Sequence, residues 1–415
     1  MNGSLPSAFE TRRRPILPAP PRGDVVLTAS VLILLGLGTV MVFNTSYFYA
    51  QDRFGDAYLF TRKHLIALVT GGAALGVAWR MPSRWLRPLT YPLLAVAAAA
   101  LATVLHPGIG VANGGARRWF DLGGFNFQPS ELAKLAVVLY LAHSITKKGE
   151  RVRRFATGFL PHVVVCGAIA GLVVLEPDYG TAVLVGVILF VMLMSGGARL
   201  THLAGAAALA LPVVIWGATS ADYRWARLTS FLHPWQDARR SGFQLVQSLV
   251  AFGSGGLSGV GLGAGRQKMF YLPGAHTDFI FSVIGEELGL VGTLGVVALF
   301  GLVAFGGYRL AWRRADPYAA QLAFGLTSLL VLQAAVNMAV TVGLLPTKGI
   351  PLPFVSYGGS ALVFSMLEMG CLLSIARESR LESVSGARPS SDRVEVSGIG
   401  AVGWTADERS GPWGR

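Results

Sequence analysis

Long apolar runs limit what this chain can fold into more than any other feature of its sequence. A helix that crosses a bilayer needs about 20 mostly apolar residues. In the hydrocarbon of a bilayer, only helices and closed barrels can form all the hydrogen bonds of their backbone groups internally. Ten runs are of this kind, at residues 25–44, 62–80, 87–105, 130–146, 158–175, 179–197, 200–217, 278–308, 318–344 and 352–376. The sequence therefore predicts an all-α integral membrane protein with about ten transmembrane helices.

The composition agrees with a membrane protein. Of the 415 residues, 53% are hydrophobic and only 14% are charged, whereas a soluble domain carries about 25% charged residues. The net charge of +13 is explained by Lys and Arg in cytoplasmic loops, which interact with anionic headgroups, so we expect no nucleic-acid partner. Cys166 and Cys371 lie far apart in apolar runs and predict neither a disulfide framework nor a cysteine metal site.

The basic residues also set the orientation. A cytoplasmic N-terminus places most Lys and Arg inside, including those of "KKGERVRR" and "RLAWRR", as the positive-inside rule requires. Ten spans then return the C-terminus to the cytoplasm. We expect three regions: a disordered cytoplasmic tail without a cleavable signal peptide at 1–24, a ten-helix membrane domain at 25–376, and a second disordered cytoplasmic tail at 377–415.

Two outside loops hold most of the candidate chemistry. The larger, at 218–277, separates the seventh and eighth spans and contains "FQLVQSLVAFG", which is too short to span and predicts an interfacial or re-entrant helix. Its "GVGLGA" has the form of a dinucleotide fingerprint, but no strand–helix–strand unit surrounds it. Arg266 and Lys268 follow these glycines and are candidates to meet a pyrophosphate.

The smaller outside loop, at 106–129, leads into the fourth span and carries Arg117, Arg118 and Trp119. Two interpretations have equal support. Trp119 is an aromatic-belt residue and the two arginines pair with lipid headgroups, or the three residues form a pocket for a lipid-linked anionic sugar. Glu131 and Lys134 come next and share a helix face. A structural ion pair lining an interior groove is the interpretation we favour for them.

The stretch "PGAHTDFIFSVIGEELG" opens the eighth span with Asp278, two residues after His276. An aspartate there most often complements the helix dipole, although desolvation would also raise its pKa and make it a better base. Glu287 lies about 13–14 Å further along a helix axis and needs a partner. Before the last span, "PTKGIPLPFVSYGGS" predicts a rigid irregular entry with Lys348 at the outer surface, and Glu368 follows within the span.

Taken together, these stretches resemble the SEDS family, the shape, elongation, division and sporulation proteins of bacteria. The matching pieces run in family order from about residue 25 to 376: "GARRWF", "FQPSELAKL", "EPDYGTA", "QSLVAFGSGGLSGVGLGAG", "HTDFIFSVIGEELGLVG" and "LPTKGIPLPFVSYGGS". The resemblance implies a ten-helix fold and a peptidoglycan glycosyltransferase. Such an enzyme polymerises lipid II, a disaccharide-pentapeptide on undecaprenyl pyrophosphate, at the outer face of the cytoplasmic membrane.

The resemblance also assigns roles. The family's essential aspartate matches Asp278, which reverses the helix-dipole interpretation, and its essential tryptophan matches Trp119. Glu131 and Lys134 match positions important for activity. The remaining substrate-binding candidates are Arg117, Arg118, Arg266, Lys268, His276 and Lys348. A divalent cation, Mg or Mn, is a possible cofactor, and a class B penicillin-binding protein with other division proteins is the implied partner.

Within the family, the stretches "HTDFIFSVIGEELG" and "LPTKGIPLPF" are similar to those of the division type, FtsW. This similarity implies a location at the division septum. The elongation type, RodA, and the sporulation type remain alternatives. A lipid II flippase and a division scaffold are alternatives from other classes. Four positions depart from the family pattern: His233, Gly274, Ala361 and Glu368. None removes a presumed catalytic group.

Overall fold

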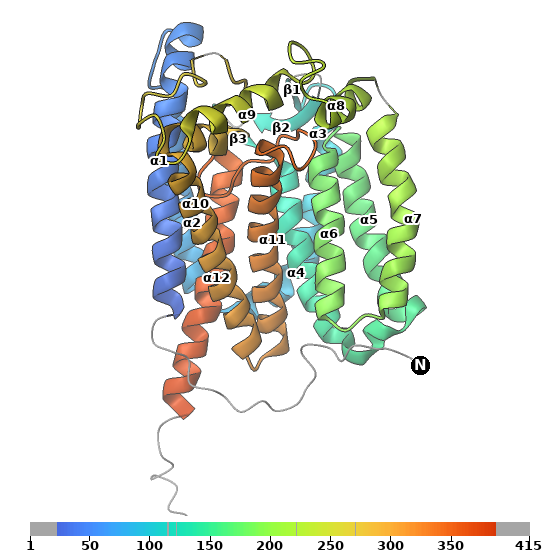
Figure 1. Cartoon of the computed structure of the whole chain (residues 1–415). Helices are drawn as coiled ribbons and strands as arrows, with labels where there is room; N and C mark the ends of the chain where they lie inside the picture. Colours follow the sequence, from blue (N-terminus) through green and yellow to red (C-terminus); the bar gives the residue numbers. More distant parts are fainter. Residues whose placement is uncertain (1–22, 114–115, 122, 221, 270, 387–415) are drawn as a thin grey trace, which may run out of the picture.

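The chain folds into a bundle of long helices. The computed structural model describes residues 23–386 except 114, 115, 122, 221 and 270. Figure 1 shows the long helices standing side by side: α1 (Gly23–Phe54), α2 (Leu59–Arg80), α3 (Leu86–Val104), α4 (Pro129–Lys148), α5 (Leu160–Leu175), α6 (Tyr179–Ser195), α7 (Leu200–Thr219), α10 (Ile280–Arg313), α11 (Pro317–Thr341) and α12 (Gly359–Gly386). Each predicted span overlaps one of them, so the all-helical prediction is confirmed.

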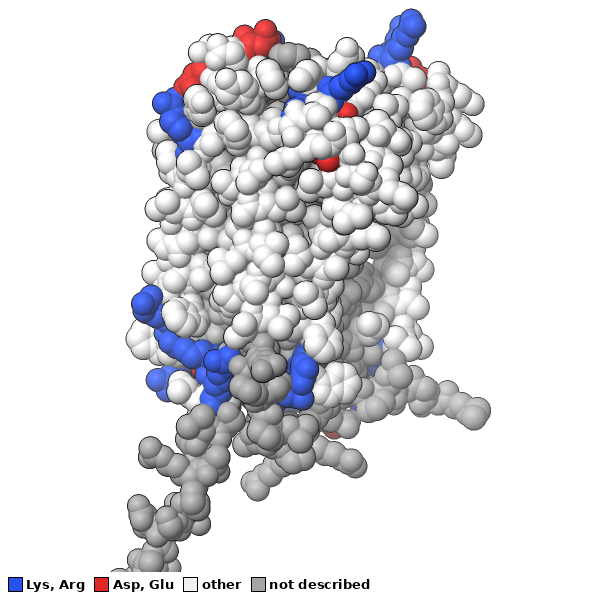
Figure 2. All heavy atoms as spheres, turned by 60° about the vertical axis from the view of Figure 1, so that its left-hand side comes forward, with Lys and Arg blue, Asp and Glu red and all other residues white. Residues whose placement is uncertain are grey.

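Seven helices in the described part are long and apolar enough to cross a membrane: α1, α3, α5, α7, α10, α11 and α12. Helix α6 is apolar but shorter, and α2 and α4 complete the bundle. Figure 2 shows a face on which charged side chains gather at the upper and lower ends and leave the band between them uncharged. This is the pattern of a multi-pass membrane protein, because charges avoid hydrocarbon.

Helices α4 and α11 form the centre of the bundle. Nearly the whole length of α4 is buried, and α11 packs against α4, α10 and α6. Small residues permit this close approach: a side chain at Gly325 would meet Met192 at 2.6 Å. In lipid, such packing replaces the hydrophobic effect as the force between helices.

The upper end of the bundle is covered by shorter elements. Helix α8 (Asp222–Leu232) and helix α9 (Phe243–Gly255) lie there, beside a small antiparallel sheet of order β1–β2–β3, from Val111–Asn113, Ala116–Asp121 and Asn126–Phe127. Helix α9 confirms the helix expected within the larger loop. The sheet was not predicted, because its strands are too short for a period-2 pattern to stand out from the glycines between them.

Three short helical pieces link the longer helices. They are the 3-10 helices η1 (Ser83–Trp85) and η2 (Gly149–Arg153), and the π-helical η3 (Phe155–Phe159).

The last span differs from its prediction at both ends. The last span was predicted from 352, but α12 begins at Gly359, because Pro351 and Pro353 interrupt the helix. Its other end reaches Gly386, so residues 377–386 are helical rather than part of a disordered tail. Residues 1–22 and 387–415 lie outside the described part, and the predicted tails there stay predictions.

Candidate functional site

Asp278 lies in the turn that leads into α10, at the upper end of the bundle. The turn closes on Gly274, whose carbonyl accepts hydrogen bonds from the N–H groups of Thr277 and Phe279 at 3.0 and 3.1 Å. Gly274 has a φ of +70°, a conformation that glycine adopts without strain. Glycine therefore suits this turn, at one of the four positions that depart from the family pattern.

The backbone of Asp278 is held by α11. The side-chain amide of Asn337 donates one hydrogen bond to the carbonyl of Asp278 at 2.8 Å and another to that of Ile350 at 2.7 Å. One buried amide thus joins the turn before α10 to the irregular segment 342–358. Gly349 in that segment leaves room for the carboxylate, since a side chain there would approach Oδ2 of Asp278 to 3.0 Å.

The surroundings of Asp278 make its carboxyl a weaker acid than a carboxyl exposed to water. Burial raises the pKa of its carboxyl to about 7, and the negative charge of Asp178 acts in the same direction, while Arg118 and Arg227 oppose it. At neutral pH the carboxyl is therefore divided between its two protonation states. A group that can both take up and release a proton near the working pH is suited to general base catalysis.

Asp178, which the sequence analysis missed, comes from the connection between α5 and α6. It caps α6, its carboxylate accepting from the N–H and the hydroxyl of Thr181 at 3.2 and 2.8 Å. Lys348 packs against the first turn of α6, where a Cβ atom at Gly180 would lie 3.2 Å from the Cδ atom of Lys348. Burial lowers the pKa of the Lys348 ammonium, and Asp178 partly restores it.

Arg118 on β2 clamps this connection. Its guanidinium donates to the carbonyls of Glu176 and Pro177 at 2.8 and 2.6 Å. Strand residues alternate between faces, so the exposed Arg117 shares a face with Trp119 rather than with Arg118. The structure thus brings Arg118 and Arg227 into the electrostatic surroundings of Asp278, and Lys348 into those of Asp178.

Glu176 is a second acid that the sequence analysis missed. It is fully buried at 0% exposure, and neither of its carboxyl oxygens has a hydrogen-bond partner within the described residues. Burial raises its pKa to about 8, with Asp178 adding to the rise and Arg118 opposing it. The signal in the sequence was two acids in the short "EPDYG" between two apolar runs.

The predicted ion pair of Glu131 and Lys134 is confirmed, at 2.9 Å and buried on both sides. The Lys134 ammonium also donates to the Gln333 side chain at 2.6 Å, and the amide of Gln333 donates to the Pro351 carbonyl at 3.2 Å. The pair therefore connects α4, through α11, to the same irregular segment that borders Asp278. Glu368 on α12 is buried within reach of both charges.

His276 lies among aromatic rings instead of charges. Its ring centroid is 5.0 Å from that of Phe60, 5.5 Å from Tyr49 and 5.7 Å from Tyr357. Burial lowers its pKa to about 4, so the imidazole is neutral at neutral pH. Its carbonyl accepts from the N–H of Tyr357 at 2.9 Å, which joins the turn of Asp278 to the segment before α12.

Lys268 belongs to a separate buried cluster. Its ammonium donates to Asn44, to the Gly263 carbonyl and to Glu287 at 2.6, 2.7 and 2.8 Å. Glu287 thereby has the partner that its depth requires, and it also accepts from the N–H of Gly263 at 2.9 Å.

The neighbouring Glu286 accepts from the N–H of Arg266 at 2.8 Å, while the side chain of Arg266 is exposed. These contacts fix the glycine-rich loop onto α10. For Lys268 they describe a structural partner rather than a group directed at a substrate.

No metal cluster is built by the protein alone: among the described residues, no group of three or more His, Cys, Asp or Glu side chains is placed to hold an ion. Mg²⁺, however, is usually bound by one or two carboxylates together with substrate phosphates. Asp278 and Asp178 supply two carboxylates whose charges disfavour each other, and they fit that requirement.

Comparison with known proteins agrees with the motifs. A family model described as "Cell cycle protein", which groups FtsW, RodA and SpoVE, matches residues 25–381. The chain belongs to this family. The FtsW/RodA/SpoVE family is the one that the motifs from "GARRWF" to "SYGGS" resemble, so the family prediction is confirmed.

Relatives with curated names are similar over most of the chain. A probable peptidoglycan glycosyltransferase FtsW of Geobacter metallireducens is 43% identical over 86% of this chain and 95% of that protein. The corresponding protein of Thioalkalivibrio sulfidiphilus is 44% identical over 88% and 94%. Stage V sporulation protein E of Bacillus subtilis is 37% identical over 86% and 98%.

Solved structures agree in fold. A chain from a peptidoglycan synthase complex, described as coordinating polymerization and crosslinking, superposes with a TM-score of 0.69 at 29% identity, covering 85% of this chain and 97% of that chain. The rod shape determining protein RodA of Thermus thermophilus gives 0.63 at 29% identity, over 85% and 96%.

Proposed function

We propose that this chain is a peptidoglycan glycosyltransferase of the division type, which polymerises lipid II into glycan strands during septal wall synthesis. Its membership of the family and the curated names of its relatives support the enzyme class, and the similarity to proteins named FtsW supports the division type over elongation or sporulation. The observation that carries the mechanism is Asp278, a carboxyl with a pKa near 7 beside basic groups at one end of a membrane bundle.

In the proposed reaction, Asp278 accepts the proton of the acceptor sugar hydroxyl while that oxygen attacks the anomeric carbon of the donor. The new bond is the glycosidic C–O bond, and the bond that breaks joins the anomeric carbon to the phosphate oxygen. Undecaprenyl pyrophosphate leaves with the electron pair, and a single displacement inverts the configuration. Positive groups must take up the charge of the leaving group.

Arg118 and Arg227 are the basic groups whose charges act on Asp278, and the charge of Lys348 acts on Asp178. Arg117 with Trp119 presents a second face of β2 for the phosphate and sugar. A divalent cation, Mg or Mn, would be a second source of positive charge, and Asp178 and Asp278 would hold it together with the substrate phosphates. Asp278 would then act as a ligand instead of as the base. When bound, such an ion neutralises charge on the pyrophosphate. Arg266, His276, Glu131 and Lys134 remain proposed contributors to substrate binding or to its positioning.

The proposed topology has ten spans, with α2, α4 and α6 crossing alongside the seven that length and composition identify. The start of α1 and the end of α12 lie at the lower end of the bundle (Figure 1), which we assign to the cytoplasm, with the region of 218–277 and Asp278 outside. A class B penicillin-binding protein is the proposed partner, because a structural relative comes from a peptidoglycan synthase complex.

The polymerase is tested with the purified chain, its cognate transpeptidase and fluorescent lipid II, with products separated on a gel. We expect a glycan ladder from the wild type and from Asp52→Asn, an exposed control, and none from Asp278→Ala. A ladder from Asp278→Ala would remove Asp278 from the mechanism. No ladder from any protein, with the partner bound, would favour a flippase or a scaffold, and lipid flipping in liposomes would separate those two.

A further inference from the structure

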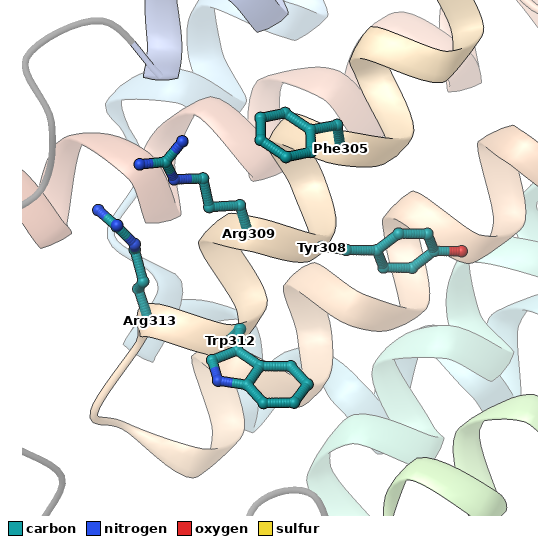
Figure 3. A pocket seen from close by; sticks show the side chains of 5 residues that line it. All are labelled: Phe305, Tyr308, Arg309, Trp312 and Arg313. Carbon is teal, nitrogen blue, oxygen red and sulfur yellow. The ribbon is translucent and has the colours of Figure 1, made fainter.

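A hollow of about 480 Å³ lies at the lower end of α10, the opposite end from Asp278 (Figure 3). It is lined by Phe305, Tyr308, Arg309, Trp312 and Arg313. Spacings of three and four residues make these side chains neighbours on the helix surface. Three of the five are aromatic, two are cationic and none is acidic, so the hollow joins an apolar wall to positive charge.

The two arginines are not neutralised within the described part of the chain, where no acidic side chain forms an ion pair with Arg309 or Arg313. Their neighbour Arg314 differs, because it pairs with Glu378 and Glu382 at 3.1 and 2.9 Å. Within the described residues, the Nη1 atom of Arg313 is buried and has no hydrogen-bond partner. A buried donor left unsatisfied is costly, so the Arg313 guanidinium has hydrogen-bonding capacity that the described protein groups do not meet.

The two guanidinium groups extend to the same side of α10, while Trp312 and Tyr308 extend to the other (Figure 3). The guanidinium of Arg309 also lies over the Phe305 ring, 5.6 Å from its centroid, where a cation–π contact holds it. An anion that bridges the two arginines would therefore lie beside the Phe305 ring. Arg binds phosphate through two parallel N–H donors, so phosphate is the anion that this geometry favours.

The face above the hollow is apolar and exposed. Phe305 is 60% exposed, and Leu302 and Leu294 further up α10 are 43% and 56% exposed. In a membrane protein such a face contacts acyl chains, while Trp312, at 65% exposure, lies where aromatic residues mark the membrane–water interface. Acyl chains attached to a phosphate at this place would therefore lie along the exposed apolar face of the same helix.

We propose that the Arg309–Arg313 hollow binds the phosphate headgroup of an anionic phospholipid, in the leaflet opposite to the one in which transfer occurs. In the orientation given above this is the cytoplasmic leaflet, whose anionic lipids attract juxtamembrane basic groups. The site is independent of the transfer reaction, so it stands even if Asp278 has another role.

The test measures lipid retention on the delipidated full-length chain by native mass spectrometry. Phosphatidylglycerol and phosphatidylcholine with the same acyl chains are added in turn, and inorganic phosphate is added as a competitor. The variant is R309Q/R313Q. The matched control is R151Q/R199Q, which removes two exposed arginines, one in η2 and one between α6 and α7, neither of which lines the hollow.

The wild type and the control should prefer phosphatidylglycerol. The R309Q/R313Q variant should lose about 30-fold in affinity for it, since each basic side chain at an anionic surface contributes about 1 kcal/mol and about 1.4 kcal/mol is tenfold. Equal binding by the variant and the wild type would overturn the proposal, as would displacement of the lipid by millimolar inorganic phosphate. Each single variant is measured too, with thermal melting, so a folding defect in the double variant does not decide the result.

Discussion

Replacing Asp278 with asparagine should inactivate the enzyme and stabilise the fold. The pKa of this carboxyl rises from 3.8 to about 7 on folding, which means that the folded state disfavours the charged form. Such a group does not lower the free energy of unfolding below pH 3.8. Its destabilising effect grows as the pH rises and is complete above about pH 7. Asparagine has the same shape and no charge, so it removes the cost.

The magnitude follows from the shift. About three pKa units at about 1.4 kcal/mol each correspond to about 4 kcal/mol. Because Asp278 is only half-buried, solvent screens part of this, and we expect about 2–4 kcal/mol at pH 8. Near pH 5 the gain should fall to about a third of that value, because the pH is then only slightly above the pKa of the unfolded chain.

The assay is thermal melting of the purified protein in detergent at pH 5, 6, 7 and 8. The Asp278→Asn variant should melt higher than the wild type at pH 8, and the gap should close toward pH 5. The exposed Asp52→Asn control should show no such pH dependence. Polymerisation by the wild type should fall about tenfold per unit below pH 7, as the base becomes protonated.

A gap that is absent, or that is as large at pH 5 as at pH 8, would refute the reasoning. The carboxyl would then be ionised in the folded state over the whole range, and a raised pKa would not explain its action as a base.

Three further results are expected. Gly349→Ala should slow polymerisation about 10- to 100-fold by displacing the proposed base, since its methyl group lies 3.0 Å from the carboxylate; unchanged rates on the gel would contradict this. Lys268→Met should cost about 3–5 kcal/mol in thermal unfolding by leaving Glu287 unpaired, whereas the exposed Arg266→Gln should stay within about 0.5 kcal/mol. Glu176→Gln should raise the melting temperature more at pH 8 than at pH 5, because its pKa is raised to about 8, while keeping the glycan ladder; loss of the ladder would give this acid a role in the reaction.

The long helices could be predicted because their cause is local. An apolar run in lipid must satisfy its own backbone, so runs such as 318–344 identify a helix without knowledge of its neighbours. The ion pair of Glu131 and Lys134 could be predicted for the same reason, as the two residues are three apart on one helix. The division-type motifs identified the family and singled out Asp278 by resemblance.

Other contacts depend on packing between distant segments, and no local pattern contains them. The short strands of the β-sheet depend on turns that single-sequence periodicity does not resolve. The prolines before α12 predicted an irregular entry, but the apolar residues among them led the predicted span to begin at 352 instead of at Gly359. The partner of Glu287 could not be predicted, because Lys268 approaches it through a loop held by glycine backbone N–H groups.

The sequence by itself determined that this is a helical membrane protein, which family it resembles, and which aspartate is the candidate base. Only the tertiary structure decided why that aspartate can act as one. Its raised pKa depends on burial and on Asp178, which lies on a different helix connection a hundred positions earlier, and its backbone is held by Asn337 of a third element. Electrostatic interactions act through space rather than along the chain, so they can be identified only from the three-dimensional arrangement of the helices.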